Sequence, residues 1–113
     1  LENEANTAFV ASFQDAYGRL PSIYASQGFD TANLILSALD TASVSDRDSF
    51  REALRAADFT SVRGAFAFAP NHHPIHSIYV REVVEIDGTL TNRIIGTAFG
   101  DDYRDIHGAD CAM

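Results

Sequence analysis

The order of the expected secondary structure constrains this chain more than any single motif does. Three segments with helical patterning come first, and nearly all of the strand signal follows the start of the junction Phe59–Arg81, whose sequence is FTSVRGAFAFAPNHHPIHSIYVR. A complete small α/β domain usually alternates strands with helices. We therefore expect an α/β chain of three helices followed by a strand and a β-hairpin, which together form the end of a larger fold.

Two helices are expected in the first 40 residues. The first spans residues 3 to 17, with Asn3 as its N-cap and Gly18 as the residue that ends it. The second spans residues 22 to 40 and starts directly after Pro21. Apolar residues occupy nearly all sides of this second helix, which predicts that it is buried on more than one face.

A third helix and a hairpin follow. Ser45 and Asp48 have the spacing of a capping box, so we expect Ser45 to be the N-cap of the third helix. The alternation of Phe66 and Phe68 with alanine predicts a short strand. Beyond it we expect a long strand from Ile75 to Ile86, a tight turn at Asp87-Gly88, a return strand from Thr89 to Phe99, and a loosely held tail over residues 100 to 113.

Composition excludes several classes of function. The chain of 113 residues carries a formal net charge of −8, from 16 acidic and 8 basic residues, and every basic residue is arginine. Such an acidic chain repels nucleic acid, so no nucleic-acid partner is expected. No nucleophile motif, nucleotide-binding glycine loop or catalytic carboxylate pair stands out. We therefore expect a protein that is not an enzyme and that holds no cofactor.

The histidines and the cysteine each have two interpretations. His72, His73 and His76 are close enough in sequence to raise a metal-site hypothesis, but adjacent side chains of an extended chain point to opposite sides and no further ligand stands at a familiar spacing. We expect a polar loop without a metal. Cys111 is the single cysteine. It is either an unpaired thiol in the tail or a half-cystine whose partner lies in an upstream segment outside this sequence.

Longer segments resemble a known family. The segments PSIYASQGFDTANLILSAL, SDRDSFREALRAADF and SVRGAFAFAPNHHPIHSIYVREVVEIDGTLTN are similar to the C-terminal part of the type I periplasmic solute-binding proteins of ABC importers, the leucine/isoleucine/valine-binding proteins and their relatives. The resemblance covers nearly the whole chain and depends on the order of its elements. It implies a C-terminal fragment of a bilobal α/β fold, in which two lobes close on a solute about a hinge.

The resemblance also implies boundaries and site residues. Residues 1–74 would belong to the N-terminal lobe, and residues 75–113 would form the hinge crossing, the β-hairpin and the tail of the C-terminal lobe. Tyr24 matches an aromatic position that faces the interlobe cleft in relatives, and its ring and hydroxyl suit a pocket wall. An ordinary core or rim aromatic is the competing interpretation. Ser22 and Gln27 are its expected neighbours at a ligand-binding site without a metal.

The implied function is that of a receptor in the periplasm. It would capture a branched-chain or other amino acid, or an aromatic or hydrophobic carboxylate, and present it to the membrane permease of an ABC importer. A ligand-sensing or regulatory domain with the same fold is the alternative. Open sheet edges and the apolar residues Phe9, Leu36 and Phe66 should be covered by the remainder of the receptor or by another copy of the chain.

Overall fold

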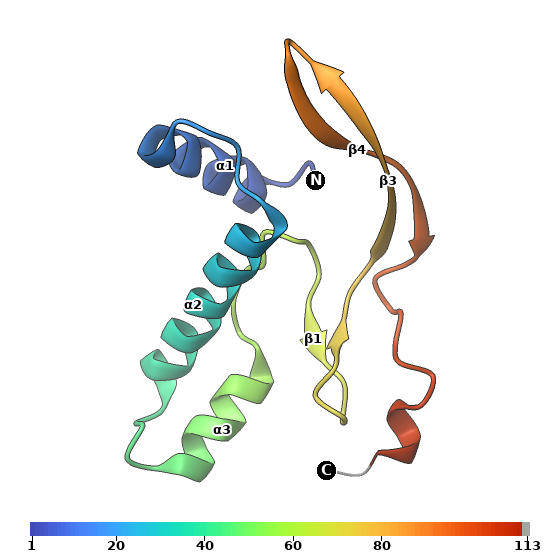
Figure 1. Cartoon of the computed structure of the whole chain (residues 1–113). Helices are drawn as coiled ribbons and strands as arrows, with labels where there is room; N and C mark the ends of the chain where they lie inside the picture. Colours follow the sequence, from blue (N-terminus) through green and yellow to red (C-terminus); the bar gives the residue numbers. More distant parts are fainter. Residues whose placement is uncertain (112–113) are drawn as a thin grey trace.

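The structure, a computed structural model, describes residues 1–111. Figure 1 shows helices on one side and a long hairpin on the other. The helices are α1 (Glu4–Tyr17), α2 (Ile23–Thr41), α3 (Arg47–Ala56) and a short 3-10 helix, η1 (Gly108–Asp110). Two antiparallel sheets are formed by β1 (Ala67–Phe68) with β2 (Pro74–Ile75), and by β3 (Ile78–Ile86) with β4 (Thr89–Phe99). The predicted order of three helices, a strand and a hairpin is confirmed.

The helix ends follow local chemistry. The Asn3 side chain accepts a hydrogen bond from the Asn6 amide at 2.7 Å, and Gly18 ends α1 in the left-handed conformation with φ of 65°. Ser22 caps α2 and so lies just before the helix, whereas residues 22 to 40 were expected to form it. The N-cap predicted for the third helix is wrong.

Asp46, and not Ser45, caps α3. The Asp46 carboxylate accepts a hydrogen bond from the Ser49 amide at 3.2 Å. The Ser45 hydroxyl lies 2.8 Å from the Ser43 hydroxyl instead. Both Ser45 and Asp46 are good capping residues, so the spacing alone could not separate a start at one from a start at the other.

The single strand predicted from Ile75 to Ile86 is also wrong, because it is broken at His76 and Ser77. Residues before the break pair with β1, in the register Ala67 with Ile75, and residues after it pair with β4. The two pieces therefore belong to different sheets. The turn at Asp87-Gly88 is confirmed, and both residues have positive φ, 50° and 75°.

The elements form two units. We call α1, α2, α3, β1 and β2 the helical unit, and β3 with β4 the hairpin unit. Within residues 1–111 no helix packs against β3 or β4, whereas α2 packs on α3 and α3 packs on β1. The buried apolar residues all lie in the helical unit or its loops: Phe9, Ala38, Ala57, Val62 and Ala69.

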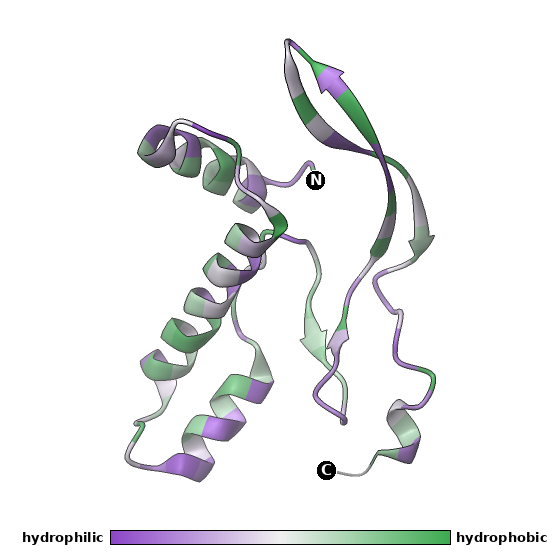
Figure 2. Cartoon of the chain, in the orientation of Figure 1, coloured by the Kyte–Doolittle hydropathy of each residue, from purple (hydrophilic) through white to green (hydrophobic). Residues whose placement is uncertain are grey.

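Much apolar surface stays exposed. Figure 2 shows hydrophobic residues along α2 and along both strands of the hairpin unit. Leu36 is 58% exposed, although α2 was predicted to be buried on several faces. The accessible surface is 8020 Å², whereas a compact protein of this mass exposes about 6,100 Å². The radius of gyration is 16.3 Å, against about 13 Å for a compact chain of this length. The helical unit thus presents an apolar face that this chain does not cover.

The C-terminal tail is not loosely held, so that prediction is wrong as far as residue 111. Gly108 is buried against Asn71, and the Asp105 carboxylate accepts a hydrogen bond from the Asn71 amide at 3.1 Å. The contact joins residues 34 positions apart, so no local pattern announces it. Within residues 1–111, none of the helices combines the length and the apolar character that crossing a bilayer requires.

The hairpin turn yields a test. A methyl group added at Gly88 meets no atom within 4 Å, so Gly88→Ala is opposed only by its φ of 75°. We expect the substitution to lower the free energy of unfolding by roughly 1–2 kcal/mol in the intact protein, as measured by urea denaturation. Gly96→Ala is the matched control, because Gly96 in β4 has equally open space and lies outside the left-handed region. Equal losses of unfolding free energy in Gly88→Ala and Gly96→Ala would show that backbone strain at the turn does not cause the destabilisation.

Candidate functional site

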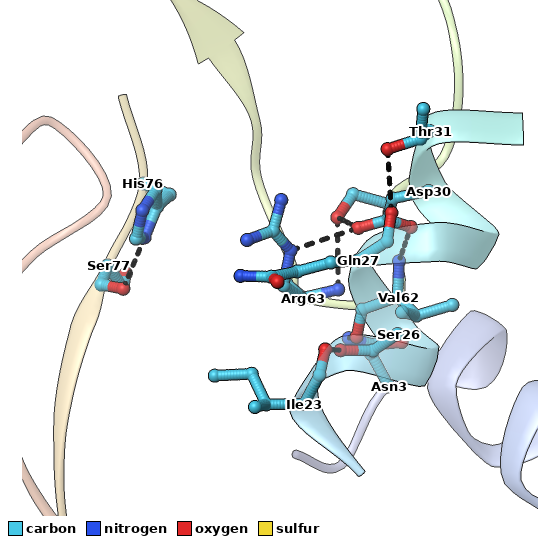
Figure 3. A network of polar contacts seen from close by, with 11 residues as sticks. Asn3, Ile23, Ser26, Gln27, Asp30, Thr31, Val62, Arg63, His76 and Ser77 are labelled. Carbon is cyan, nitrogen blue, oxygen red and sulfur yellow. Dashed lines mark hydrogen bonds and ion pairs between the residues drawn. The ribbon is translucent and has the colours of Figure 1, made fainter. Parts of the chain in front are cut away.

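A buried carboxylate organises the region where α2 meets the loop before β1. Asp30 lies on α2 and is 2% exposed. Its Oδ1 accepts a hydrogen bond from the Val62 amide at 3.0 Å, and its Oδ2 accepts from the Ser61 hydroxyl at 2.6 Å and from Arg63 Nε at 3.1 Å. Figure 3 shows these contacts converging on one carboxylate. A buried charge needs such donors, because removing it from water is otherwise costly.

The loop is shaped by the same donors. The Ser61 hydroxyl also accepts a hydrogen bond from the Arg63 amide at 3.0 Å, which closes a tight turn. Val62 is 1% exposed, and its carbonyl accepts from the Asn3 side chain at 3.3 Å. Since Asn3 also caps α1, one chain of hydrogen bonds connects α1, the loop and α2.

Arg63 is a candidate site residue that the sequence interpretation missed. Nε is held by Asp30, and the guanidinium carbon lies 5.7 Å from the centre of the Phe66 ring. Within residues 1–111 the two terminal nitrogens have no hydrogen-bond partner, and the side chain is 31% exposed. A fixed guanidinium with free terminal N–H groups is suited to a carboxylate. The sequence carried no clear signal for this pair, because α2 holds two acids, Asp30 and Asp40, and Arg63 follows a closer acid, Asp58, by only five residues.

Gln27 precedes Asp30, the partner of Arg63, by one turn of α2. In Figure 3 the Gln27 amide and the Arg63 guanidinium point in the same direction, toward the side on which His76 and Ser77 are drawn. Gln27 is exposed, and its backbone carbonyl accepts a hydrogen bond from the Thr31 hydroxyl at 2.8 Å. Within residues 1–111 its side-chain amide makes no hydrogen bond. An amide adds both a donor and an acceptor for a polar ligand.

The three residues predicted to bind ligand lie on the first two turns of α2. Tyr24 is 79% exposed, so its ring is not part of a core inside this chain. The Ser22 hydroxyl accepts a hydrogen bond from the Ala25 amide at 3.4 Å, which gives this residue a capping role. Tyr24 and Gln27 are three residues apart and share a side of the helix, and the loop with Arg63 is bonded to Asp30 one turn further along.

Two open hollows occur elsewhere on the surface. The larger, about 570 Å³, lies between the C-terminal end of α1 and the turn of the hairpin unit, with Gln14 and Arg19 on one side and Ile86 and Thr89 on the other. The smaller, about 250 Å³, lies among α2, α3 and β1. Tyr24, Ser22 and Gln27 line neither hollow. The larger one shows that open space separates the helical unit from the hairpin unit.

The histidines of the loop point to different partners. His72 Nε2 accepts a hydrogen bond from Arg55 Nε at 3.1 Å, and His73 Nδ1 lies 2.8 Å from Asp105 Oδ2. His76 Nδ1 lies 2.8 Å from the Ser77 carbonyl. Among residues 1–111 no group of three or more histidine, cysteine or acidic side chains is arranged to hold a metal ion. Cys111 is exposed.

Comparison with known proteins decides the family. A profile of the periplasmic binding proteins matches residues 1–89. The chain belongs to the periplasmic binding protein family. The resemblance stated from the sequence is thereby confirmed, and because this family consists of binding proteins, so is the expectation that the chain is not an enzyme. No curated protein matched the chain.

A solved structure also matches this periplasmic binding protein. It is the solute-binding protein of an ABC transporter from R. palustris, in complex with benzoate. The two chains are 35% identical and superpose with a TM-score of 0.75. The match covers 87% of this chain and 27% of that one, so our chain corresponds to about a quarter of the length of the matched protein. The α/β fold of a periplasmic-binding-protein fragment is confirmed.

The Asp30 contacts lead to a stability prediction. Asp30→Ala removes the acceptor of the buried Val62 amide and the partner of Arg63. We expect a loss of about 3–5 kcal/mol in the free energy of unfolding, because a charge and a buried donor are left without partners. Asp40→Ala on the same helix is the control, since Asp40 is exposed, and should change stability by about 0.5 kcal/mol or less. Similar urea midpoints for both variants would contradict the organising role of Asp30.

Proposed function

We propose that this chain is part of a receptor that captures a small carboxylate between two lobes and delivers it to the permease of an ABC importer. The observation that carries the proposal is the 35% identical structure, which is the solute-binding protein of an ABC transporter and holds benzoate. Membership of the periplasmic binding proteins over residues 1–89 supports the periplasm as the site of action. Because the matched protein is part of an ABC transporter, we favour a role in transport over the alternative of a sensing domain.

The chemistry of the helical unit supports a carboxylate as the solute. Arg63 is the cation whose terminal nitrogens are free within residues 1–111 and whose position is held by a buried partner. Gln27 adds a hydrogen-bonding amide, and Tyr24 adds an exposed aromatic surface on the same part of α2. An aromatic wall with a few placed polar groups is the usual composition of a small-molecule site. An aromatic or hydrophobic carboxylate fits these three groups best, because Tyr24 can pack against its apolar part.

The break between β2 and β3 supports a hinge. His76 and Ser77 connect the helical unit to the hairpin unit, and they belong to neither sheet. No helix packs on the hairpin unit within residues 1–111, so a change of backbone angles at these two residues can move one unit against the other. In this proposal residues 1–74 form part of the N-terminal lobe, the chain crosses near Pro74–Ser77, and the hairpin unit belongs to the C-terminal lobe.

The exposed apolar face of the helical unit supports the proposal that another protein surface packs against it. The chain exposes about 1,900 Å² more than a compact protein of its mass. This excess on one chain is more than twice the roughly 800 Å² that each partner buries in a standard protein–protein interface. The remainder of the receptor is the occupant that we favour, because the matched solute-binding protein is a single chain of which this one covers 27%. A second copy of this chain is the competing occupant.

Solute affinity tests the proposed site. In the intact receptor, with benzoate as the probe, we expect Arg63→Met to weaken binding by about 10- to 100-fold, which is the loss of a charge-assisted hydrogen bond. Arg63→Lys should recover part of the affinity, because the charge is kept and the planar fork is lost. Tyr24→Ala should weaken binding by about tenfold through the lost ring contact. Isothermal titration calorimetry measures all three.

Two controls separate a site effect from a folding effect. Arg51→Met removes an exposed arginine of α3 that pairs with Asp48 and should leave benzoate affinity unchanged. Benzamide, which has the same ring without the charge, should lose little affinity when Arg63 is replaced. Unchanged benzoate affinity in both Arg63→Met and Tyr24→Ala, in a wild-type protein that does bind benzoate, would place the site elsewhere.

The uncovered face is tested with the 113-residue chain alone. We expect it to self-associate or to aggregate at micromolar concentration in sedimentation velocity, because its apolar face lacks a cover. Leu36→Glu, together with Leu39→Glu, should reduce the association by placing charge on the exposed side of α2. A compact monomer of the unsubstituted chain would contradict the need for a partner surface.

A further inference from the structure

The C-terminal segment makes a second connection between the hairpin unit and the helical unit. After β4 ends at Phe99, the Tyr103 ring stacks on the Phe99 ring with centres 4.3 Å apart. The chain then turns toward the loop between β1 and β2, where Asp105 meets Asn71 and His73. Figure 1 shows this segment, in red, running on from β4 toward the end of the molecule at which α3 lies. The hairpin unit is therefore attached at both of its ends.

The contacts that attach the C-terminal segment to the helical unit centre on Asp105. Its Oδ2 accepts a hydrogen bond from Asn71 Nδ2 at 3.1 Å and lies 2.8 Å from His73 Nδ1. Its Oδ1 accepts from the His107 amide at 2.9 Å, and its carbonyl accepts from the Gly108 amide at 3.0 Å. One residue thus folds the tail into η1 and attaches it to the helical unit.

Asn71, in the loop between β1 and β2, is the residue of the helical unit that binds the Asp105 carboxylate. It is 5% exposed, and its Oδ1 accepts a hydrogen bond from the His73 amide at 3.2 Å, so its Nδ2 is directed to Asp105. Gly108 packs directly on the Asn71 amide: a Cβ at Gly108 would lie 3.4 Å from Nδ2. The loop is in turn tied to α3 through the hydrogen bond from Arg55 to His72. A buried amide with both ends in use is a specific contact rather than a chance approach.

We propose that residues 100–110 are a strap that fastens the hairpin unit to the helical unit at Asn71, with Asp105 as the fastening residue. A unit joined only through His76 and Ser77 could swing and twist freely about that connection. A second attachment leaves from the end of β4, where Phe99 pairs with Ile78 at the start of β3, so that two adjacent chain segments and not one join the units. This restricts the twist and limits how far the hairpin unit opens. The strap therefore sets the balance between open and closed arrangements, and through it the affinity for whatever binds between the units.

Protonation of Asp105 should release the strap. Its pKa lies below the ordinary value of 3.8, mainly because the His107 amide donates to the carboxylate, with His73 and Asn71 adding to the effect and partial desolvation opposing it. A lowered carboxyl pKa gives stabilisation that is present above the ordinary value and is lost as the pH falls through the lowered one. The other charged groups nearby are Arg55, which donates to His72, and Asp110, whose carboxylate lies 3.8 Å from His107 Nδ1. The strap should stay fastened at neutral pH and detach only below pH 3.8.

Amide hydrogen exchange in the intact protein tests the fastening without any solute. Asp105→Ala should raise the exchange rate of the peptide that contains the Gly108 and Asp110 amides by roughly tenfold, because the hydrogen bonds that hold it are lost. Asp101→Asn is the control, since Asp101 is exposed on the same segment and makes no side-chain hydrogen bond within residues 1–111. An exchange rate in Asp105→Ala equal to that of the control would overturn the proposal.

Exchanging the side chains of Asn71 and Asp105 tests whether the single variants release the tail only because they misfold. Asn71→Asp places a carboxylate against Asp105 and should release the tail to the same extent as Asp105→Ala. Combining Asn71→Asp with Asp105→Asn restores one acid and one amide in contact, and should return the exchange rate to within about threefold of the wild type. Failure of the double variant to recover, with both single variants folded by circular dichroism, would contradict a direct contact.

The effect of the strap on the distance between the two units is measured separately. Spin labels on α3 and on the hairpin turn report the distance between the units, and Asp105→Ala should broaden that distribution. The affinity for benzoate should change by several-fold in the same variant, a readout that rests on the proposed function. If the tail detaches while the distance distribution stays the same, the segment is only a docked tail and the strap is overturned. If the distances broaden but no benzoate binding is found in any variant, the proposed solute fails and the strap stands.

Discussion

The burial of one carboxylate shapes the helical unit. Asp30 is almost completely excluded from water, so its two oxygens need donors, and a loop that returns from α3 to the middle of α2 supplies them. That loop places Val62 in the core and aligns the Arg63 guanidinium. It also meets Asn3, the cap of α1. One electrostatic requirement therefore brings together segments about 30 residues apart and orients the arginine at the candidate site.

The second constraint is mechanical. The helical unit holds the buried apolar residues, and the hairpin unit stands apart from the helices with most of its side chains exposed. Two connections span the space between the units, one at His76 and Ser77 and the other from Asp105 to Asn71. A binding protein that closes on its solute needs units that move, and it also needs a limit on that movement. In the function that we propose, the break in the strand provides the first and the polar contacts of the tail provide the second.

Local features were predictable because they depend on neighbours in sequence. Asn3 caps α1, Gly18 ends it, and Asp87-Gly88 forms the hairpin turn, all as their types and positions indicate. The N-cap of α3 was misassigned by one residue, because Ser45 and Asp46 are both capping residues. The strand break at His76 and Ser77 was missed, since a β-rich run does not say which residue pairs with which sheet.

The sequence by itself determined the helices and the turn, because these depend on residue type and short spacing, and it determined the family, because the order of the elements along the chain is itself a feature of the sequence. Tertiary structure alone decided that Asp30 is a buried partner of Arg63 and that Asp105 fastens the tail to Asn71. These pairs are 33 and 34 residues apart, and each requires the chain to turn back on itself before the partners can meet. Their energy comes from burial and from fixed donor geometry, and both exist only after the chain has folded.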